Sequence, residues 1–211
     1  MPLSALAEKA LLGYELGDTA PTIPGTHYAG LLAGSVWAAS TAYTVGQFVI
    51  AATWSSLPSS SVSKVFKCTT AGTSGSTVPS GFSTATAGST VTDGSVTWTE
   101  ASNLLAGWTT AAPVAIEPSG NGYARVAVTN NTTNWPSPSG SDPTTVQNGT
   151  AITFPTTTGS WGAVVFGYVL MDASTSGNAR LWGLLTATTS ALASSGVVPS
   201  FAVSAVSVTL L

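Results

Sequence analysis

The chain has 211 residues, of which 44% are hydrophobic and only 6% charged, and its formal net charge is −3. It contains one histidine, His27, and one cysteine, Cys68. Proton transfer, nucleophilic attack and metal ligation draw on His, Cys, Asp, Glu and Lys, so we expect neither an enzyme nor a bound metal or other cofactor. The five basic residues form no cluster in the sequence, which argues against nucleic-acid binding because phosphate recognition needs grouped Lys and Arg.

No stretch of the sequence predicts a membrane anchor or a secretory signal. The most apolar run, 162–171, is about half of the roughly 20 residues that a spanning helix needs. Glu8, Lys9 and Glu15 interrupt the apolar start of the chain, so we expect assembly in the cytoplasm. The low surface charge, unusual for a free monomer, has two interpretations: a surface covered by neighbouring subunits, or a solvated face rich in Thr and Ser.

The first segment predicts an amphipathic helix. Leu3, Leu6, Ala7, Ala10, Leu11 and Tyr14 recur at spacings of three and four residues. Ser4 is placed to cap the helix start and Gly17 to end it. One apolar face predicts docking onto a sheet or a partner subunit, so Leu6, Leu11 and Tyr14 are candidate assembly contacts. A strand is expected next, over 26–32.

The region 34–103 is rich in Gly, Ser and Thr, with short apolar runs at 48–52, 65–68 and 96–99. The Asp93-Gly94 pair between β-forming residues is a strong tight-turn signal. By composition, 55–63 and 71–89 are expected to be loops.

Longer strands are expected after residue 122. They cover 124–129, 150–154 after an Asn148-Gly149 turn, and 163–171, which is apolar on both faces and predicted to be central. The segment 178–185 follows a turn at 172–177 and predicts a hairpin. Residues 201–203 and 206–211 are expected to form a second one. Strands at this spacing without intervening helices favour an antiparallel sandwich.

Two blocks of sequence resemble a family of small bacteriophage virion proteins, often described as tail-fibre or minor structural proteins. The matching residues are 5–12, Tyr28-Ala29-Gly30-Leu31, 120–126, 148–155, Ser160-Trp161-Gly162, Met171-Asp172-Ala173 and 181–185. The resemblance covers about 1–33 and 107–211, and it implies a location in the virion.

The block between these two resembles a small β module that recurs in phage tail proteins and is similar to chitin-binding-type modules. The matching residues are Trp37, 41–43, 45–47, 66–75 and 91–98. We therefore expect an inserted module at 34–106 within a virion-anchoring sandwich formed by 1–33 and 107–211. The extra length at 54–63 departs from the module pattern and puts its binding face in doubt.

Four aromatic residues of the expected module are candidate glycan contacts: Trp37, Tyr43, Trp54 and Trp98. Exposed rings stack on sugars, and such modules often bind polysaccharide. The alternative is that these rings form the core of a small module, because aromatic side chains dominate small cores. Core packing is the favoured interpretation for Trp37 and Trp98, whereas Trp54, in the extended loop, is the preferred contact.

The other chemically capable residues have structural explanations. Cys68 is expected to be a buried strand residue and His27 a partly buried one. Asp93 and Glu100 could form a glycosidase pair, yet Asp93 is better explained by its turn. Arg125, a charge within an alternating strand, is expected to pair with an acid, reach a neighbouring subunit as an assembly contact, or face solvent.

The sequence therefore predicts a mainly-β protein: an antiparallel β-sandwich with an N-terminal α-helix and an inserted small β module. Three functions remain open. The first is a tail-fibre or host-recognition component whose module contacts bacterial surface polysaccharide. The second is a capsid decoration protein on the phage head, and the third is a polysaccharide depolymerase. For the first two, the expected partners are copies of the chain and other virion proteins.

Overall fold

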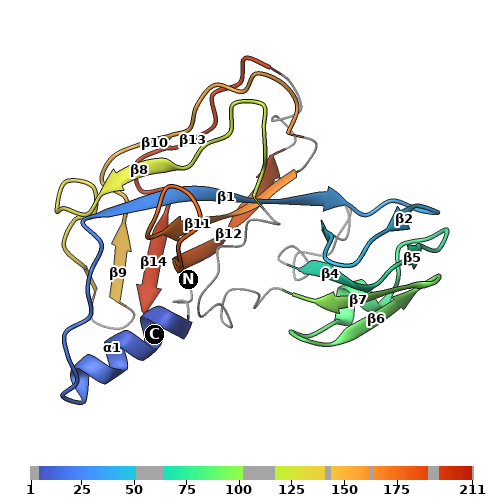
Figure 1. Ribbon diagram of the computed structural model, residues 1–211, viewed down its shortest axis with the longest axis horizontal. Coiled ribbons are helices and arrows are strands. Elements are labelled where there is room, and N and C mark those ends of the chain that lie inside the picture. The colour runs from blue at the N-terminus through green and yellow to red at the C-terminus, as the bar shows by residue number, and fades with distance from the viewer. Residues whose placement is uncertain are drawn as a thin grey trace.

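The computed structural model describes residues 5–50, 64–101, 117–140, 144–161, 164–189 and 195–210. The chain is mainly β, with one large mixed sheet and a helix at its N-terminal end. This confirms the predicted fold class. Strands β1 and β8 to β14 form what we call the body, and β2 to β7 with the short helix α2 form what we call the module (Figure 1).

Helix α1 (Ala5–Glu15) matches the predicted helix and packs against β12 (Ala179–Thr189). The helix ends at Glu15, and Gly17, the residue expected to end it, follows in the turn with a φ of +93°, a left-handed conformation that glycine adopts without strain. The backbone N–H of Asp18 donates to the Gly13 carbonyl at 2.8 Å and closes the last turn. The predicted cap, Ser4, lies outside the described residues. No helix in the described ranges is long and apolar enough to cross a membrane.

Strand β1 (Thr26–Val36) is longer than the predicted 26–32 and connects the body to the module (Figure 1). Its first residues pair with β8 (Val126–Thr129) on one edge, while Tyr28 to Gly34 pair with β11 (Val164–Met171) on the other. Ser35 and Val36 then pair in parallel with β3 (Phe48–Ile50). The large sheet therefore runs in the order β12, β11, β1, β3, β4, β7, β6.

The centre of the body is covered on both faces, as the apolar run at 163–171 predicted. Strand β11 lies between β1 and β12, and every residue from Val165 to Met171 is buried. Alternate β1 side chains divide between two apolar clusters: Leu31 packs on one face and Leu32 on the other. Strand β12 forms the predicted hairpin with β11, because the Asp172 carboxylate accepts the Asn178 backbone N–H at 2.6 Å and closes the turn.

The predicted second hairpin is wrong. Strand β13 (Ser200–Phe201) pairs with β10 (Ile152–Thr153), and β14 (Ser207–Leu210) pairs with β9 (Thr144–Gln147). Buried Asn148 separates them: its side chain donates to the Ala202 carbonyl and accepts the Val206 N–H, at 2.9 and 2.7 Å. The two C-terminal strands thus pair with earlier segments and not with each other.

The module contains part of the large sheet, one small separate strand pair and the predicted turn. Strands β4 (Val65–Thr70), β6 (Thr90–Asp93) and β7 (Val96–Glu100) extend the large sheet beyond β3. Asp93 and Val96 close a hairpin around Gly94, whose φ is +61°, which confirms the Asp-Gly turn. Strand β2 (Ala42–Tyr43) pairs with β5 (Gly72–Thr73), and α2 spans Gly81–Thr84.

A buried carboxylate holds the core of the module together. Asp93 Oδ2 accepts the indole N–H groups of Trp37 and Trp98 at 2.7 and 2.9 Å. Its Oδ1 accepts the Gly75 backbone N–H at 2.7 Å. Trp98 in turn contacts Tyr43 edge to face, with ring centroids 4.8 Å apart. Asp93 therefore joins segments of the module that are distant in sequence.

The module is in apolar contact with the body. Phe48, Ile50 and Val65 from the module share a cluster with Leu32 and Phe166 from the body. The sheet is also continuous through β1 and β3. Division of the chain at 34 and 106 stays a prediction, and its second boundary lies outside the described residues.

We predict that Asp93→Asn destabilises the module. The amide replaces one acceptor oxygen with a donor that faces N–H groups, and a buried unsatisfied donor costs about 1–3 kcal/mol. Thermal unfolding followed by circular dichroism should show a Tm lower by several degrees. Asp18→Asn makes the same chemical change at an exposed position and should leave Tm unchanged. Equal Tm values for the two variants would contradict the role of Asp93.

Candidate functional site

Three of the four aromatic residues proposed as glycan contacts lie in the module core. Trp37, Tyr43 and Trp98 are 8%, 6% and 0% exposed. A ring must be exposed to stack on a sugar, so this burial argues against a glycan-binding role for these three side chains. It fits the core alternative already favoured for Trp37 and Trp98. Trp54 lies outside the described residues.

The acids considered as a glycosidase pair are also buried. Asp93 is 4% exposed and Glu100 is 3% exposed. Asp93 already accepts three hydrogen bonds from its own module. A glycosidase needs two carboxyl groups that flank a bound glycosidic bond, so these positions do not resemble such a site.

Cys68 and His27 occupy buried or half-buried strand positions, as expected from the sequence. Cys68 is fully buried in the module core, and this burial raises the pKa of its thiol. Burial lowers the pKa of His27, and the nearby Arg180 guanidinium acts in the same direction while Asp172 opposes it. Among the described residues, no group of three or more His, Cys, Asp or Glu side chains could hold a metal ion.

Arg125 forms a buried ion pair within its own chain, the first of its predicted alternatives. The side chains of Arg125 and Glu117 are 4% and 6% exposed, and Arg125 Nη2 donates to Glu117 Oε2 at 2.6 Å. Arg125 Nε donates to both carboxylate oxygens. Its Nη1 donates to the carbonyls of Ala173 and Ser176, in the turn between β11 and β12, at 2.8 and 2.7 Å. Such burial leaves little of Arg125 available as an assembly contact.

Tyr123 connects this ion pair to β1. Its hydroxyl donates to Glu117 Oε1 at 2.6 Å and accepts the Leu31 backbone N–H at 3.0 Å. Burial, together with the negative charge of Glu117, raises the pKa of Tyr123 well above its usual range. Gly30, next to Leu31, is required here because a Cβ at that position would collide with Glu117 Oε1. The network therefore depends on a glycine in the central strand.

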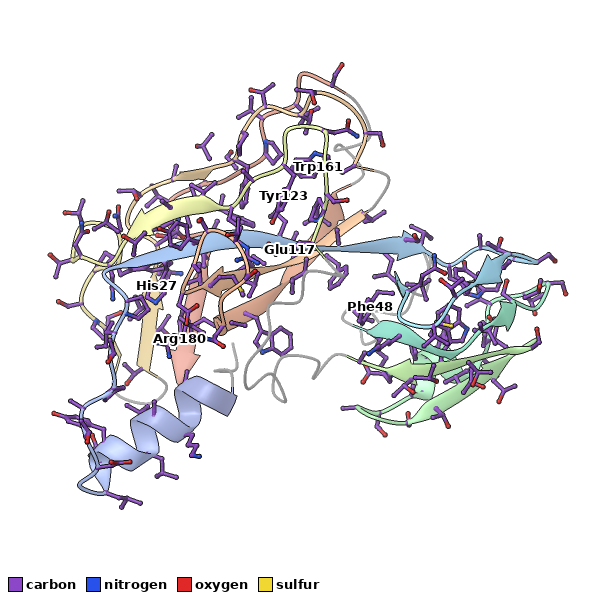
Figure 2. All side chains as sticks on the ribbon, viewed as in Figure 1. His27, Phe48, Glu117, Tyr123, Trp161 and Arg180 are labelled. Carbon is purple, nitrogen blue, oxygen red and sulfur yellow. The ribbon has the colours of Figure 1, made fainter. Side chains whose placement is uncertain are left out.

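A small polar cavity lies where the body meets the module, and we call it the junction pocket. Its volume is about 180 Å³. Figure 2 shows Glu117 and Tyr123 beside the middle of β1, with Trp161 further into the body and Phe48 on the module side. The residues that line it include Ser35, Gln47, Phe48, Glu117, Ser119 and Trp161.

A second, apolar groove of about 230 Å³ lies beneath α1. Ala7, Ala10 and Leu11 form its helix side, and His27 and Arg180 belong to its sheet side. Leu11 and Tyr14, both candidate assembly contacts, are 43% and 51% exposed. The side chain of Leu6, the third candidate, lies outside the described residues.

Glu117 could not be predicted from the sequence as the partner of Arg125. The only signal in the sequence was the arginine itself. A charged residue within an alternating strand indicates a nearby acid if the strand position is buried. Nothing in the local spacing distinguishes Glu117 from the other seven acids. Gln47, Ser35 and Ser119 carried no signal, because hydroxyl and amide side chains occur throughout the chain.

We predict that Glu117→Ala lowers the free energy of unfolding by about 3–5 kcal/mol, the usual cost of leaving one partner of a buried ion pair without the other. Urea unfolding measures the loss. Glu15→Ala, which removes an exposed glutamate of α1, should cost less than about 0.5 kcal/mol. If Glu117→Ala lowers the free energy of unfolding as little as the control does, the ion pair with Arg125 does not stabilise the fold.

One family model matches the chain. It is described as podophage GP4 fiber I protein gp80, and the match covers residues 94–209, which is more than half of the sequence. The matched region contains the Glu117–Arg125 pair and the strands from β7 to β14. A search of curated proteins finds no match. The chain belongs to the family described as podophage GP4 fiber I protein gp80, and it is therefore a phage fibre protein and a component of the virion.

Proposed function

We propose that the protein is a non-enzymatic tail-fibre subunit that contacts polysaccharide on the bacterial surface. The observation that carries this proposal is the continuity of the sheet from the body through β1 into the module. Figure 1 shows the module extending from one end of β1, away from the body and α1. In this arrangement the body is held in the fibre and the module is presented to the host.

The buried acids support a binding role without catalysis. Asp93 and Glu100 are enclosed in the module, and Glu117 is neutralised by Arg125. Hydrolysis of a glycosidic bond needs one acid to protonate the leaving group and a second to act on the opposite side of the sugar. The depolymerase hypothesis lacks such a pair in the described part of the chain.

We assign assembly to α1 and the segment after it. Leu12, Leu16 and Ile23 are 62%, 78% and 68% exposed, in addition to the half-exposed Leu11 and Tyr14. Isolated exposed apolar side chains are ordinary, whereas a group of them marks an interaction surface. Contact of this surface with other fibre subunits or copies of the chain also accounts for the low overall charge. In this proposal Leu6 belongs to the same helix contact.

We predict that gold-labelled antibodies against the protein bind the tail fibres of intact virions in electron micrographs. The description of the family names a fibre protein, which favours a location on the tail over one on the head. Label arranged over the head surface would contradict the fibre assignment and favour the capsid decoration alternative.

We also predict that Trp54→Ala weakens retention of the protein on immobilised host polysaccharide. Loss of one stacked ring should reduce affinity roughly tenfold, which corresponds to about 1.4 kcal/mol. Val45→Ala removes an exposed aliphatic side chain from the module and serves as the control. Unchanged retention of Trp54→Ala would remove Trp54 from the binding surface, and progressive shortening of the polysaccharide by the wild type would overturn the non-enzymatic assignment.

A further inference from the structure

We propose that the junction pocket binds one neutral sugar residue of a surface polysaccharide. This inference rests on the proposed glycan contact and gives it a location that the aromatic residues of the module core do not provide. Residues of both parts line the pocket. Gln47 and Phe48 belong to the module, and Ser35 belongs to the end of β1. Glu117, Ser119 and Trp161 belong to the body. A bound sugar would therefore touch both parts of the protein.

Glu117 supplies a fixed polar wall of the pocket. An ionised carboxylate has about four lone-pair sites. Four hydrogen bonds occupy these sites: one from the Tyr123 hydroxyl, two from Arg125 Nε and one from Arg125 Nη2. These bonds hold the carboxylate in position before the sugar arrives, so the groups that hydrogen-bond the sugar must come from the other residues that line the pocket.

Gln47, Ser35 and Ser119 supply groups that complement sugar hydroxyls. Gln47 Oε1 accepts the Thr44 backbone N–H at 2.7 Å, which orients the side chain and leaves its NH₂ group to donate. Ser35 and Ser119 are exposed, and each hydroxyl can donate and accept. A ligand with several hydroxyl groups, each both donor and acceptor, matches this mixture.

Trp161 forms an apolar wall in a fixed orientation. Its indole N–H donates to the Asn121 carbonyl at 3.1 Å, and its ring meets Tyr123 edge to face with centroids 5.3 Å apart. Trp161 is 7% exposed, so the pocket meets a narrow part of the ring. This limited apolar contact predicts weak binding by a single sugar.

The size and charge of the pocket define the class of sugar. A volume of about 180 Å³ equals that of about six water molecules at ~30 Å³ each, which is room for one sugar ring. Arg125 compensates the charge of Glu117, so no positive charge remains to attract an acidic sugar. A second carboxylate would instead face an oxygen of Glu117, and the pocket therefore favours a neutral residue.

The test uses the full chain and a panel of monosaccharides: glucose, galactose, mannose and N-acetylglucosamine, with glucuronate as the acidic comparison. With wild-type protein, saturation-transfer NMR should detect binding of at least one neutral sugar. It should detect no binding of glucuronate. Ser119→Trp, which fills the pocket without removing a Glu117 or Arg125 contact, should weaken binding at least tenfold. Val78→Trp adds the same side chain at an exposed module position outside the pocket and should bind like wild type.

A second variant distinguishes a loss of sugar binding from a folding defect in Ser119→Trp. Gln47→Glu keeps the oxygen that accepts the Thr44 N–H and removes the NH₂ donor, so it should weaken sugar binding about fivefold with an unchanged Tm. If both Ser119→Trp and Gln47→Glu bind sugar as wild type does, the junction pocket is not the sugar-binding site.

Retention on immobilised host polysaccharide separates this inference from the proposed function. If wild type is retained, and Ser119→Trp and Gln47→Glu are retained equally well, the pocket assignment fails and the glycan contact stands. If wild type is retained by no host polysaccharide and binds no monosaccharide, the glycan contact and the pocket both fail. Reduced retention of both variants, with normal retention of Val78→Trp, supports the pocket.

Discussion

The structure depends on a single strand that is paired along both edges. Strand β1 holds β8 and β11 in the body, and its last two residues begin the sheet of the module through β3. Its residues from Ala29 to Gly34 are buried, and side chains from alternate positions enter different clusters. A strand with no free face and few free backbone groups has almost no freedom to shift its register. The position of the module relative to the body is therefore fixed by the backbone.

The Glu117–Arg125 pair strengthens the same region by a different interaction. One guanidinium joins the segment before β8 to the turn between β11 and β12, and the Tyr123 hydroxyl joins both to β1. The chain has few charged residues, and this pair lies in the interior, where an unpaired charge would be costly. The network also leaves a structured polar wall where body and module meet. Here a buried charge borders the junction pocket.

The features that the sequence predicted correctly are those that a local pattern of residues determines. The spacing of apolar residues from Leu3 to Tyr14 predicted α1. The Asp93-Gly94 pair predicted the β6–β7 hairpin, and the apolar run ending at Met171 predicted the central strand. The second hairpin failed because Asn148, more than fifty residues away in sequence, binds both Ala202 and Val206. The glycan candidates were selected by residue type, and type does not distinguish an exposed indole from one bound to a buried Asp93. Long-range hydrogen bonds of this kind leave no periodic trace in the sequence.

The order of strands in the large sheet also constrains how the chain can fold. Leu31 of β1 pairs with Tyr168 of β11, and the whole module lies between them in sequence. Closing a loop of that length carries an entropic cost before any contact forms, so pairings this distant form slowly. The hairpins of the module join neighbouring residues and do not have this barrier. During synthesis, β1 emerges long before its main partner, and its apolar side chains lack the cover of β11 until that strand has left the ribosome.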